Sequence, residues 1–240
     1  MINARQTSRP VIRGVLFDLD GTLVDTAPDM ALALNRLRLE CNLPPLPFTH
    51  IRPQVSNGAR GLLELSFGLG PEHDGFNLLR DRFLQLYNQD IASESGLFGG
   101  FTEVLGQLDR RNLHWGIVTN KPGFLTRNLL KKLGIEAPVV VAGDDLPRRK
   151  PFPDQLIYAA GGLKLRPQEI LYIGDHERDI QASHAAHMPA AAARWGYLDG
   201  ERPIEDWRAD VILDQPSDLL NWLDMPHTID TQANTTHHYG

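Results

Sequence analysis

Residues 15–25 read Val15-Leu16-Phe17-Asp18-Leu19-Asp20-Gly21-Thr22-Leu23-Val24-Asp25. The apolar run at the start of this stretch predicts a strand buried on both faces, and two carboxylates follow it, two residues apart. Because side chains alternate along a strand, Asp18 and Asp20 are expected to project to the same side. They would lie at the carboxyl end of a parallel strand, where open α/β sheets bind their ligands.

Two interpretations of this carboxylate pair stay open from the stretch alone. Neighbouring carboxylates repel each other, so keeping both ionised requires a cation, and oxygen ligands of this kind suit Mg²⁺. The alternative is a surface turn, in which Asp and Gly serve the turn geometry. A calcium loop of the EF-hand type is excluded, because its sixth position must be Gly and is Leu23 here, and a strand precedes the pair instead of a helix.

Outside this stretch, short apolar runs alternate with segments of helical spacing, which predicts a parallel sheet flanked by helices. Leu125, Leu129 and Leu133 show the helical spacing, and Gly134 is the expected C-cap. The expected fold is a doubly wound, Rossmann-like α/β domain. Its predicted strands are Val11 to Asp18, His114 to Thr119, Val139 to Ala142, Ile170 to Ile173, Ala190 to Ala193 and Val211 to Leu213.

Residues 25–95 interrupt the alternation, because they contain helical patterns and no convincing strand. An all-helical insertion of about seventy residues is large enough to be a subdomain. We therefore divide the chain into a core of residues 1–24 and 96–226, a helical insertion of residues 25–95, and a polar, disordered tail of residues 227–240. The segment Gly96 to Gly100 is expected to be a loop. Two apolar sets carry the helical spacing: Met30, Leu34, Leu37, Cys41, and Phe76, Leu79, Phe83, Leu86.

The composition excludes several classes of protein. The 240 residues are 42% hydrophobic and 22% charged, which is typical of a soluble globular protein. The net charge of −6 argues against nucleic acid or anionic membrane as a partner, since both require clustered basic residues. Neither a signal peptide nor a membrane span is predicted, so we expect a cytoplasmic protein. The single cysteine, Cys41, is expected to pack as a small hydrophobe, and the sequence carries no signal for the oligomeric state.

Four motifs in chain order resemble those of the haloacid dehalogenase superfamily of phosphatases. The first, Asp18 to Thr22, matches Asp-x-Asp-Gly-Thr in full, and the second is the strand ending Ile117-Val118-Thr119-Asn120. The third is the loop lysine Lys150, followed by Pro151-Phe152-Pro153. The fourth is a strand ending Gly174-Asp175, with Asp179 soon after. The resemblance covers nearly the whole chain apart from its two ends.

The resemblance implies a phosphate monoester hydrolase with named chemical roles. Asp18 would attack phosphorus and form an aspartyl-phosphate. Asp20 would protonate the leaving alkoxide and then take a proton from the hydrolytic water. Mg²⁺ would be held by the Asp18 side chain, the Asp20 backbone carbonyl and Asp175.

The second and third motifs would bind the phosphoryl group. Thr119 and the Asn120 backbone N–H would donate to its oxygens, and Lys150 would add a positive charge. Each has an alternative, because Lys150 is the third of three consecutive basic residues and Thr119 is a good strand former.

Supporting roles fall to three further positions. Asp179 is expected to orient the metal shell, and Gly21 and Gly174 to let the backbone turn tightly near the phosphate. His176 stands where relatives usually carry a small or acidic residue, and we interpret it as a bystander.

In this superfamily, an all-helical insertion between the first two motifs forms a cap that closes over the active site and selects the substrate. Residues 25–95 fit that description. Asn57-Gly58-Ala59-Arg60 looks like the start of a cap helix, with Asn57 as a candidate N-cap and Arg60 suited to a substrate carboxylate. An ordinary exposed helical arginine is the equal alternative.

Four segments carry a narrower resemblance within the superfamily: Asn57 to Arg60, Val118 to Pro122, Arg194 to Tyr197 and Trp207 to Asp210. They resemble the phosphoglycolate phosphatase group, especially bacterial members that dephosphorylate N-acetylmuramic acid 6-phosphate. Both substrates join a phosphate to a carboxylate-bearing skeleton, so a small substrate of this kind is the expected partner. A sugar-phosphate mutase or a broad-specificity sugar phosphate phosphatase stays open. Asp20 argues against relatives that cleave carbon–halogen or carbon–phosphorus bonds. Asp20 and the insertion argue against a phospho-accepting receiver domain. A dinucleotide-binding protein is also disfavoured, because no predicted strand is followed by Gly-x-Gly-x-x-Gly.

Overall fold

The computed structural model describes residues 11–200 and 202–225, so the predicted tail of residues 227–240 lies outside the described residues. A parallel sheet of six strands has the order β5-β4-β1-β6-β7-β8. All six predicted strands are confirmed, although the first begins at Gly14 and ends at Phe17, inside the predicted bounds. Their bounds are β1 Gly14–Phe17, β4 His114–Val118, β5 Val140–Val141, β6 Ile170–Gly174, β7 Ala190–Ala193 and β8 Val211–Leu213.

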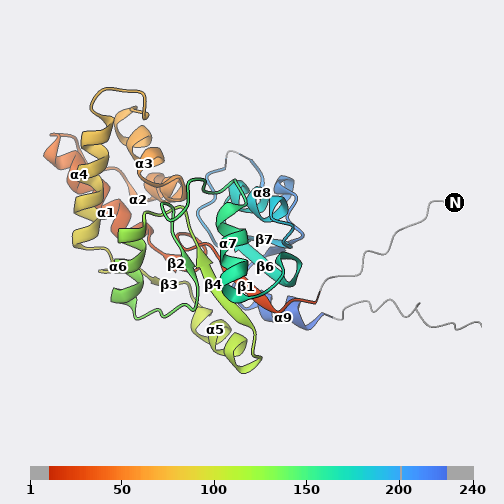
Figure 1. Cartoon of the computed structure of the whole chain (residues 1–240). Helices are drawn as coiled ribbons and strands as arrows, with labels where there is room; N and C mark the ends of the chain where they lie inside the picture. Colours follow the sequence, from red (N-terminus) through yellow and green to blue (C-terminus); the bar gives the residue numbers. More distant parts are fainter. Residues whose placement is uncertain (1–10, 201, 226–240) are drawn as a thin grey trace, which may run out of the picture.

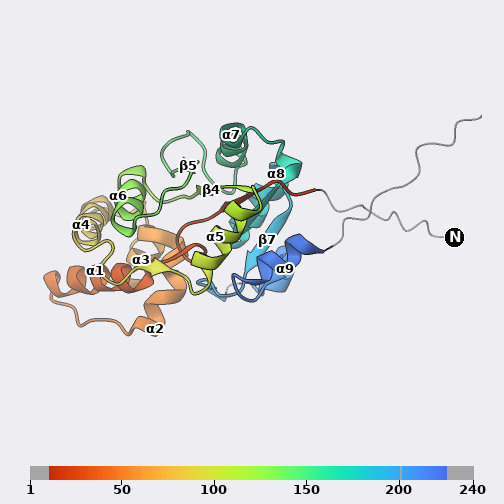
Figure 2. The same ribbon diagram turned by 90° about the horizontal axis from the view of Figure 1, so that it is seen from below.

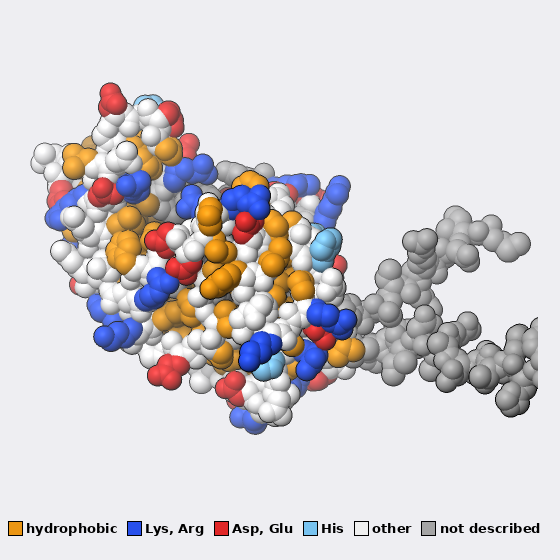
Figure 3. Space-filling view, in the orientation of Figure 1, with side chains coloured by type: hydrophobic (Ala, Val, Ile, Leu, Met, Phe, Trp, Pro, Cys, Tyr) orange, Lys and Arg blue, Asp and Glu red, His pale blue; other side chains and the backbone are white. Residues whose placement is uncertain are grey.

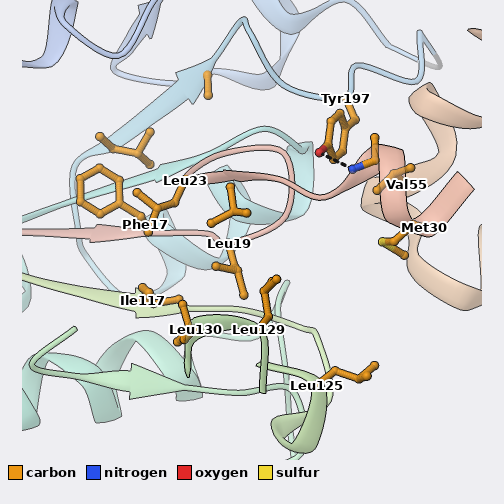
Figure 4. Close-up of a cluster of buried hydrophobic side chains, with 14 of the residues drawn as sticks. Phe17, Leu19, Leu23, Met30, Val55, Ile117, Leu125, Leu129, Leu130 and Tyr197 are labelled. Carbon is orange, nitrogen blue, oxygen red and sulfur yellow. Dashed lines mark hydrogen bonds between the residues drawn. The ribbon is translucent and has the colours of Figure 1, made fainter. Parts of the chain in front are cut away.

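Helices cover both faces of this sheet, as a doubly wound fold requires (Figure 2). On β1, Val15 and Phe17 pack into the cluster that contains α5 and α9, while Leu16 packs into the cluster that contains α7 and α8. Figure 4 shows the first cluster continuing from Phe17 and Leu23 to Leu129 and Leu130 of α6. The helices are α5 Phe101–Arg110, α6 Gly123–Leu133, α7 Asp154–Leu163, α8 Glu177–Ala185 and α9 Asp218–Asp224, with short 3₁₀ helices η2 Pro167–Glu169 and η3 Ile204–Trp207.

Every regular element between residues 26 and 95 is a helix, and these helices stand together on one side of the molecule (Figure 1). Two antiparallel strand pieces, β2 Val24–Asp25 and β3 Gly96–Leu97, join them to the sheet. The loop prediction for Gly96 was therefore wrong at its first two residues, because they pair with β2. The helices are α1 Ala27–Glu40, α2 Phe48–Ile51, the 3₁₀ helix η1 Arg52–Asn57, α3 Gly58–Phe67 and α4 Phe76–Gln89.

Two local predictions have opposite outcomes. The C-cap Gly134 is confirmed, since it ends α6 with a φ of +65°. The packing predicted for Cys41 was wrong, because α1 ends at Glu40 and the cysteine lies exposed in the turn that follows. No helix within the described ranges combines the length and apolarity that a membrane crossing needs.

Candidate active site

The carboxyl ends of three adjacent strands bring the predicted motifs together. β1 lies between β4 and β6, and Phe17 is in register with both Ile117 and Ile173. Asp18, Thr119 and Asp175 follow these strands and therefore meet at one edge of the sheet.

Lys150 lies in the middle of this edge and is almost fully buried. Its Nζ is 2.9 Å from Asp18 Oδ1 and 2.7 Å from Asp179 Oδ1, and it donates to the Tyr172 hydroxyl at 2.7 Å. Burial alone would lower the pKa of Lys150, but the two carboxylates raise it above its ordinary value. The lysine is thus a fixed positive charge beside Asp18, which excludes the alternative of a solvated loop residue.

Two amides hold the loop that carries Lys150. The Asn120 side chain donates to the Lys150 carbonyl at 2.9 Å and accepts from its N–H at 3.1 Å. Gln155 accepts from the same N–H and donates to the carbonyls of Thr119 and Ala142. Gln155 was missed by the sequence analysis, since one amide within a helix pattern carries no signal of its own.

Asp18, Asp175 and Asp179 form a cluster whose carboxylate oxygens lie within 4.8 Å of one another. Burial, followed by Asp179 and Asp175, raises the pKa of Asp18 to about 7 against the opposing effect of Lys150. Burial and Asp179 likewise raise the pKa of Asp175 to about 6. These oxygens are the donors that a hard divalent cation prefers, and a cation would relieve their repulsion. The cluster therefore fits a divalent metal.

Asp179 has additional partners in this cluster. Besides Lys150, it accepts from the His176 N–H at 3.1 Å, so both of its oxygens are engaged. This geometry agrees with an orienting role for Asp179.

Gly21 and Gly174 leave space that the carboxylates occupy. Gly21 has a φ of +81°, and a Cβ there would lie 2.1 Å from Asp175 Oδ2. A Cβ at Gly174 would lie 2.4 Å from the Cβ of Asp179. Only glycine lets the backbone approach these carboxylates so closely.

The Asp20 carboxylate is held separately from this cluster. Its Oδ1 accepts from Thr26 Oγ1 at 2.6 Å and from Lys121 Nζ at 2.9 Å. Lys121 is buried, and the sequence analysis did not single it out as a site residue although it directly follows Thr119-Asn120.

Thr119 itself is buried at the strand end. Its Oγ1 accepts from the backbone N–H of Lys121 at 3.2 Å. Thr119 lines the pocket, and its hydroxyl fixes the turn that carries Asn120 and Lys121.

A pocket of about 1070 Å³ opens between the strand ends and the helical insertion. Figure 3 shows Lys and Arg side chains along the boundary between the two parts. Asp18, Asp20 and Lys150 line its floor, while Asn57, Gly58 and Arg60 belong to its wall. Arg60 makes no hydrogen bond or ion pair with any other described residue, so its charge is free to meet a ligand.

Asn57 does precede α3, but its side chain makes no capping hydrogen bond. A 3₁₀ helix runs directly into α3, and the Asn57 amide instead accepts from Arg178 Nη2 at 2.9 Å. His176 is the N-cap of α8, where its Nδ1 accepts from the Arg178 N–H at 3.2 Å. Burial, together with Arg178, lowers the pKa of His176 to about 4, which leaves the ring neutral.

Tyr197 connects the carboxylate cluster to the start of the insertion. Its backbone N–H donates to Asp175 Oδ2 at 2.9 Å, and its hydroxyl donates to Asp25 Oδ1 at 2.6 Å. The same hydroxyl accepts from the backbone N–H of Thr26 and of Ala27. Figure 4 marks one hydrogen bond of this hydroxyl, near Val55. On the other side, Ser56 Oγ of the insertion donates to Asp175 Oδ2 at 2.7 Å.

Comparison with known proteins agrees with this geometry. The haloacid dehalogenase-like hydrolase family matches residues 15–193. A Pseudomonas putida protein named N-acetylmuramic acid 6-phosphate phosphatase is 39% identical over 215 residues, covering 89% of this chain and 96% of that protein. A Xanthomonas campestris protein named phosphoglycolate phosphatase is 40% identical over 209 residues, covering 86% and 94%.

A solved structure has the same fold over nearly its whole length. The crystal structure of a predicted phosphoglycolate phosphatase from Haemophilus somnus superposes with a TM-score of 0.78 at 30% identity, covering 88% of this chain and 97% of that one. The chain therefore belongs to the haloacid dehalogenase-like hydrolase family and is a phosphoric monoester hydrolase.

Proposed function

We propose that this chain is a Mg²⁺-dependent phosphatase that acts through an aspartyl-phosphate on Asp18. The observation that carries the proposal is the position of Asp18 between Lys150 and the Asp175–Asp179 pair at the floor of the pocket. Both partners of the Asp18 carboxylate, Lys150 and the Leu19 N–H, contact Oδ1. Oδ2 has no such partner among the described residues and is the oxygen available for attack.

The other residues at the strand ends would serve the two half-reactions. Asp18 Oδ2 forms a bond to phosphorus as the bond to the leaving oxygen breaks, and Asp20 gives its proton to that oxygen. Asp20 then takes a proton from the water that attacks the aspartyl-phosphate. Thr119 Oγ1 and the Asn120 N–H donate to the phosphoryl oxygens, and Lys150 offsets their charge.

The Asp18 side chain, the Asp20 carbonyl and Asp175 would hold Mg²⁺. When bound, the ion supplies positive charge that balances the carboxylates and the phosphoryl oxygens. Asp179 and Ser56 would keep their neighbours oriented, since they contact Lys150 and Asp175 respectively.

We further propose that residues 25–95 act as a cap over the core of residues 1–24 and 96–226. Four hydrogen bonds support this role, because they hold η1 of the insertion against the core. Arg178 Nη2 donates to the Ser56 carbonyl and to Asn57, and Arg52 donates to the carbonyls of Trp195 and Gly196 at 3.2 Å. A cap in this position would exclude water from the phosphate and supply substrate contacts.

The substrate that fits best is a sugar phosphate that also carries a carboxylate, such as N-acetylmuramic acid 6-phosphate. A volume of about 1070 Å³ is in the range of sites for ligands larger than 2-phosphoglycolate, and Arg60 offers a free cation for the carboxylate. 2-Phosphoglycolate is the second candidate, because a relative of 40% identity carries that name. We also propose that the enzyme acts in the cytoplasm.

A screen of the purified enzyme tests these proposals. It compares N-acetylmuramic acid 6-phosphate, 2-phosphoglycolate, hexose phosphates and nucleotides, each with Mg²⁺ and with EDTA. We expect phosphate release from the first substrate at the highest kcat/KM, and none with EDTA or with Asp18→Asn. Full turnover in either of those conditions would refute the mechanism, and an isomerised sugar phosphate without phosphate release would identify a mutase.

A further inference from the structure

A buried contact joins the helical insertion to the residue proposed as acid and base. Lys121 Nζ lies 2.9 Å from Asp20 Oδ1 and 3.3 Å from Asp20 Oδ2. The same Nζ donates to the Tyr87 hydroxyl at 3.0 Å and sits 4.4 Å from the centre of the Tyr87 ring. Tyr87 belongs to α4 of the insertion, whereas Lys121 and Asp20 belong to the core.

Lys121 is anchored at its backbone as well as at its ammonium group. Its N–H donates to Thr119 Oγ1, and its carbonyl accepts from the Gly143 N–H at 2.8 Å and from Thr126 Oγ1 at 3.2 Å. The turn that presents Thr119 and Asn120 to the pocket therefore also fixes where the Lys121 side chain begins.

The buried ammonium group of Lys121 is stabilised by Asp20 and Tyr87. A buried cation is costly unless it is paired, and Asp20 is the carboxylate that Lys121 contacts within the described residues. The face of the Tyr87 ring adds a cation–π contact that favours the same position of Nζ. With Thr26 Oγ1 on the same oxygen, the Asp20 carboxylate is held from two sides.

We propose that Lys121 is a positioning residue that, together with Tyr87, orients the Asp20 carboxylate for proton transfer to the leaving oxygen. The inference rests on the proposed function. It gives the insertion a part in the chemistry itself, because α4 reaches the acid–base residue through Lys121 instead of contacting only the substrate.

The test uses two substrates that differ in their need for a proton. An alkoxide leaving from a sugar phosphate must be protonated, whereas the p-nitrophenolate leaving from p-nitrophenyl phosphate is already a stable anion. A misoriented Asp20 should therefore slow the first reaction more than the second. Because kcat/KM covers the steps up to formation of the aspartyl-phosphate, its ratio between the substrates isolates this proton transfer.

For Lys121→Met we expect kcat/KM for an alkyl phosphate to fall about tenfold more than that for p-nitrophenyl phosphate. Tyr87→Phe, which removes only the hydroxyl, should change the ratio in the same direction by less. Matched controls are Lys132→Met in α6 and Tyr158→Phe in α7, both at exposed positions. If Lys121→Met does not fold, Tyr87→Phe decides the question.

Equal losses on both substrates, in an enzyme whose wild type is active, would overturn the inference alone. A wild type that hydrolyses neither substrate would overturn the proposed function and the inference with it.

Discussion

Replacing Asp18 by Asn should inactivate the enzyme and, in the metal-free protein, stabilise the fold. The cluster places three carboxylates together, of which Asp18 and Asp179 contact the Lys150 ammonium group, and the pKa of Asp18 rises from an ordinary 3.8 to about 7. Burial is the largest cause, and Asp179 and Asp175 add to it. This change in pKa corresponds to about 4 kcal/mol between the two protonation states.

The direction of the pH dependence follows from the sign of this change. An acid with a higher pKa in the folded state binds more protons folded than unfolded, so raising the pH destabilises the fold. For Asp18 this loss of folding stability begins near pH 4 and is complete just above pH 7. Asp175, whose pKa is about 6, contributes in the same direction and is present in both proteins.

Urea unfolding of EDTA-treated wild type and Asp18→Asn at about pH 5 and pH 8 measures the effect. We expect the free energy of unfolding of Asp18→Asn, relative to wild type, to increase by about 3 kcal/mol from pH 5 to pH 8, since most of the titration of Asp18 lies between these two values. Asp74→Asn is the matched control, because Asp74 is exposed and its side chain has no ion pair among the described residues. An advantage that is the same at both pH values would refute the account of the cluster.

Two further predictions concern the pocket wall and the close approach at Gly21. Arg60→Ala should raise KM about tenfold for a carboxylate-bearing phosphate and much less for p-nitrophenyl phosphate, because only the former presents a carboxylate to the guanidinium; equal changes in steady-state kinetics would remove Arg60 from the substrate site. Gly21→Ala should cost about 2–4 kcal/mol in urea unfolding, since φ is +81° and the new Cβ would meet Asp175 Oδ2. Gly161→Ala in α7 is its control, because a Cβ there meets nothing within 4 Å, and it should stabilise the helix slightly; similar effects of the two substitutions would contradict the steric argument.

The sequence predicts the parts of the site that depend on local pattern. Asp18, Thr119 and Asp175 each end an apolar run, and parallel strands bring their carboxyl ends to one edge, so their meeting follows from the alternation alone. The contact of Lys121 with Asp20 does not follow in this way, because it joins residues 101 positions apart through a side chain that periodicity does not orient.

The contacts between the insertion and the core could not be predicted from the sequence for the same reason. Ser56 reaches Asp175 across 119 positions, and no pattern within the insertion marks a serine for a carboxylate of the core. Asn57 shows how a local rule fails, since an Asn before a helix predicts a capping side chain. In the structure the preceding turn is already helical, and Arg178 offers the Asn57 oxygen a charged donor instead.

The chain is acidic overall although its proposed substrate is an anion, and the side chains around the pocket explain how both can hold. A protein of charge −6 repels anions at long range, but among the described residues the pocket is lined by seven Lys and Arg side chains and only three carboxylates. The excess of basic side chains favours a phosphate monoester in the pocket, and the cluster of Asp18, Asp175 and Asp179 beside it favours a divalent cation. Affinity for the phosphate and the fit for a metal thus come from different side chains of one site, and whole-chain charge predicts neither.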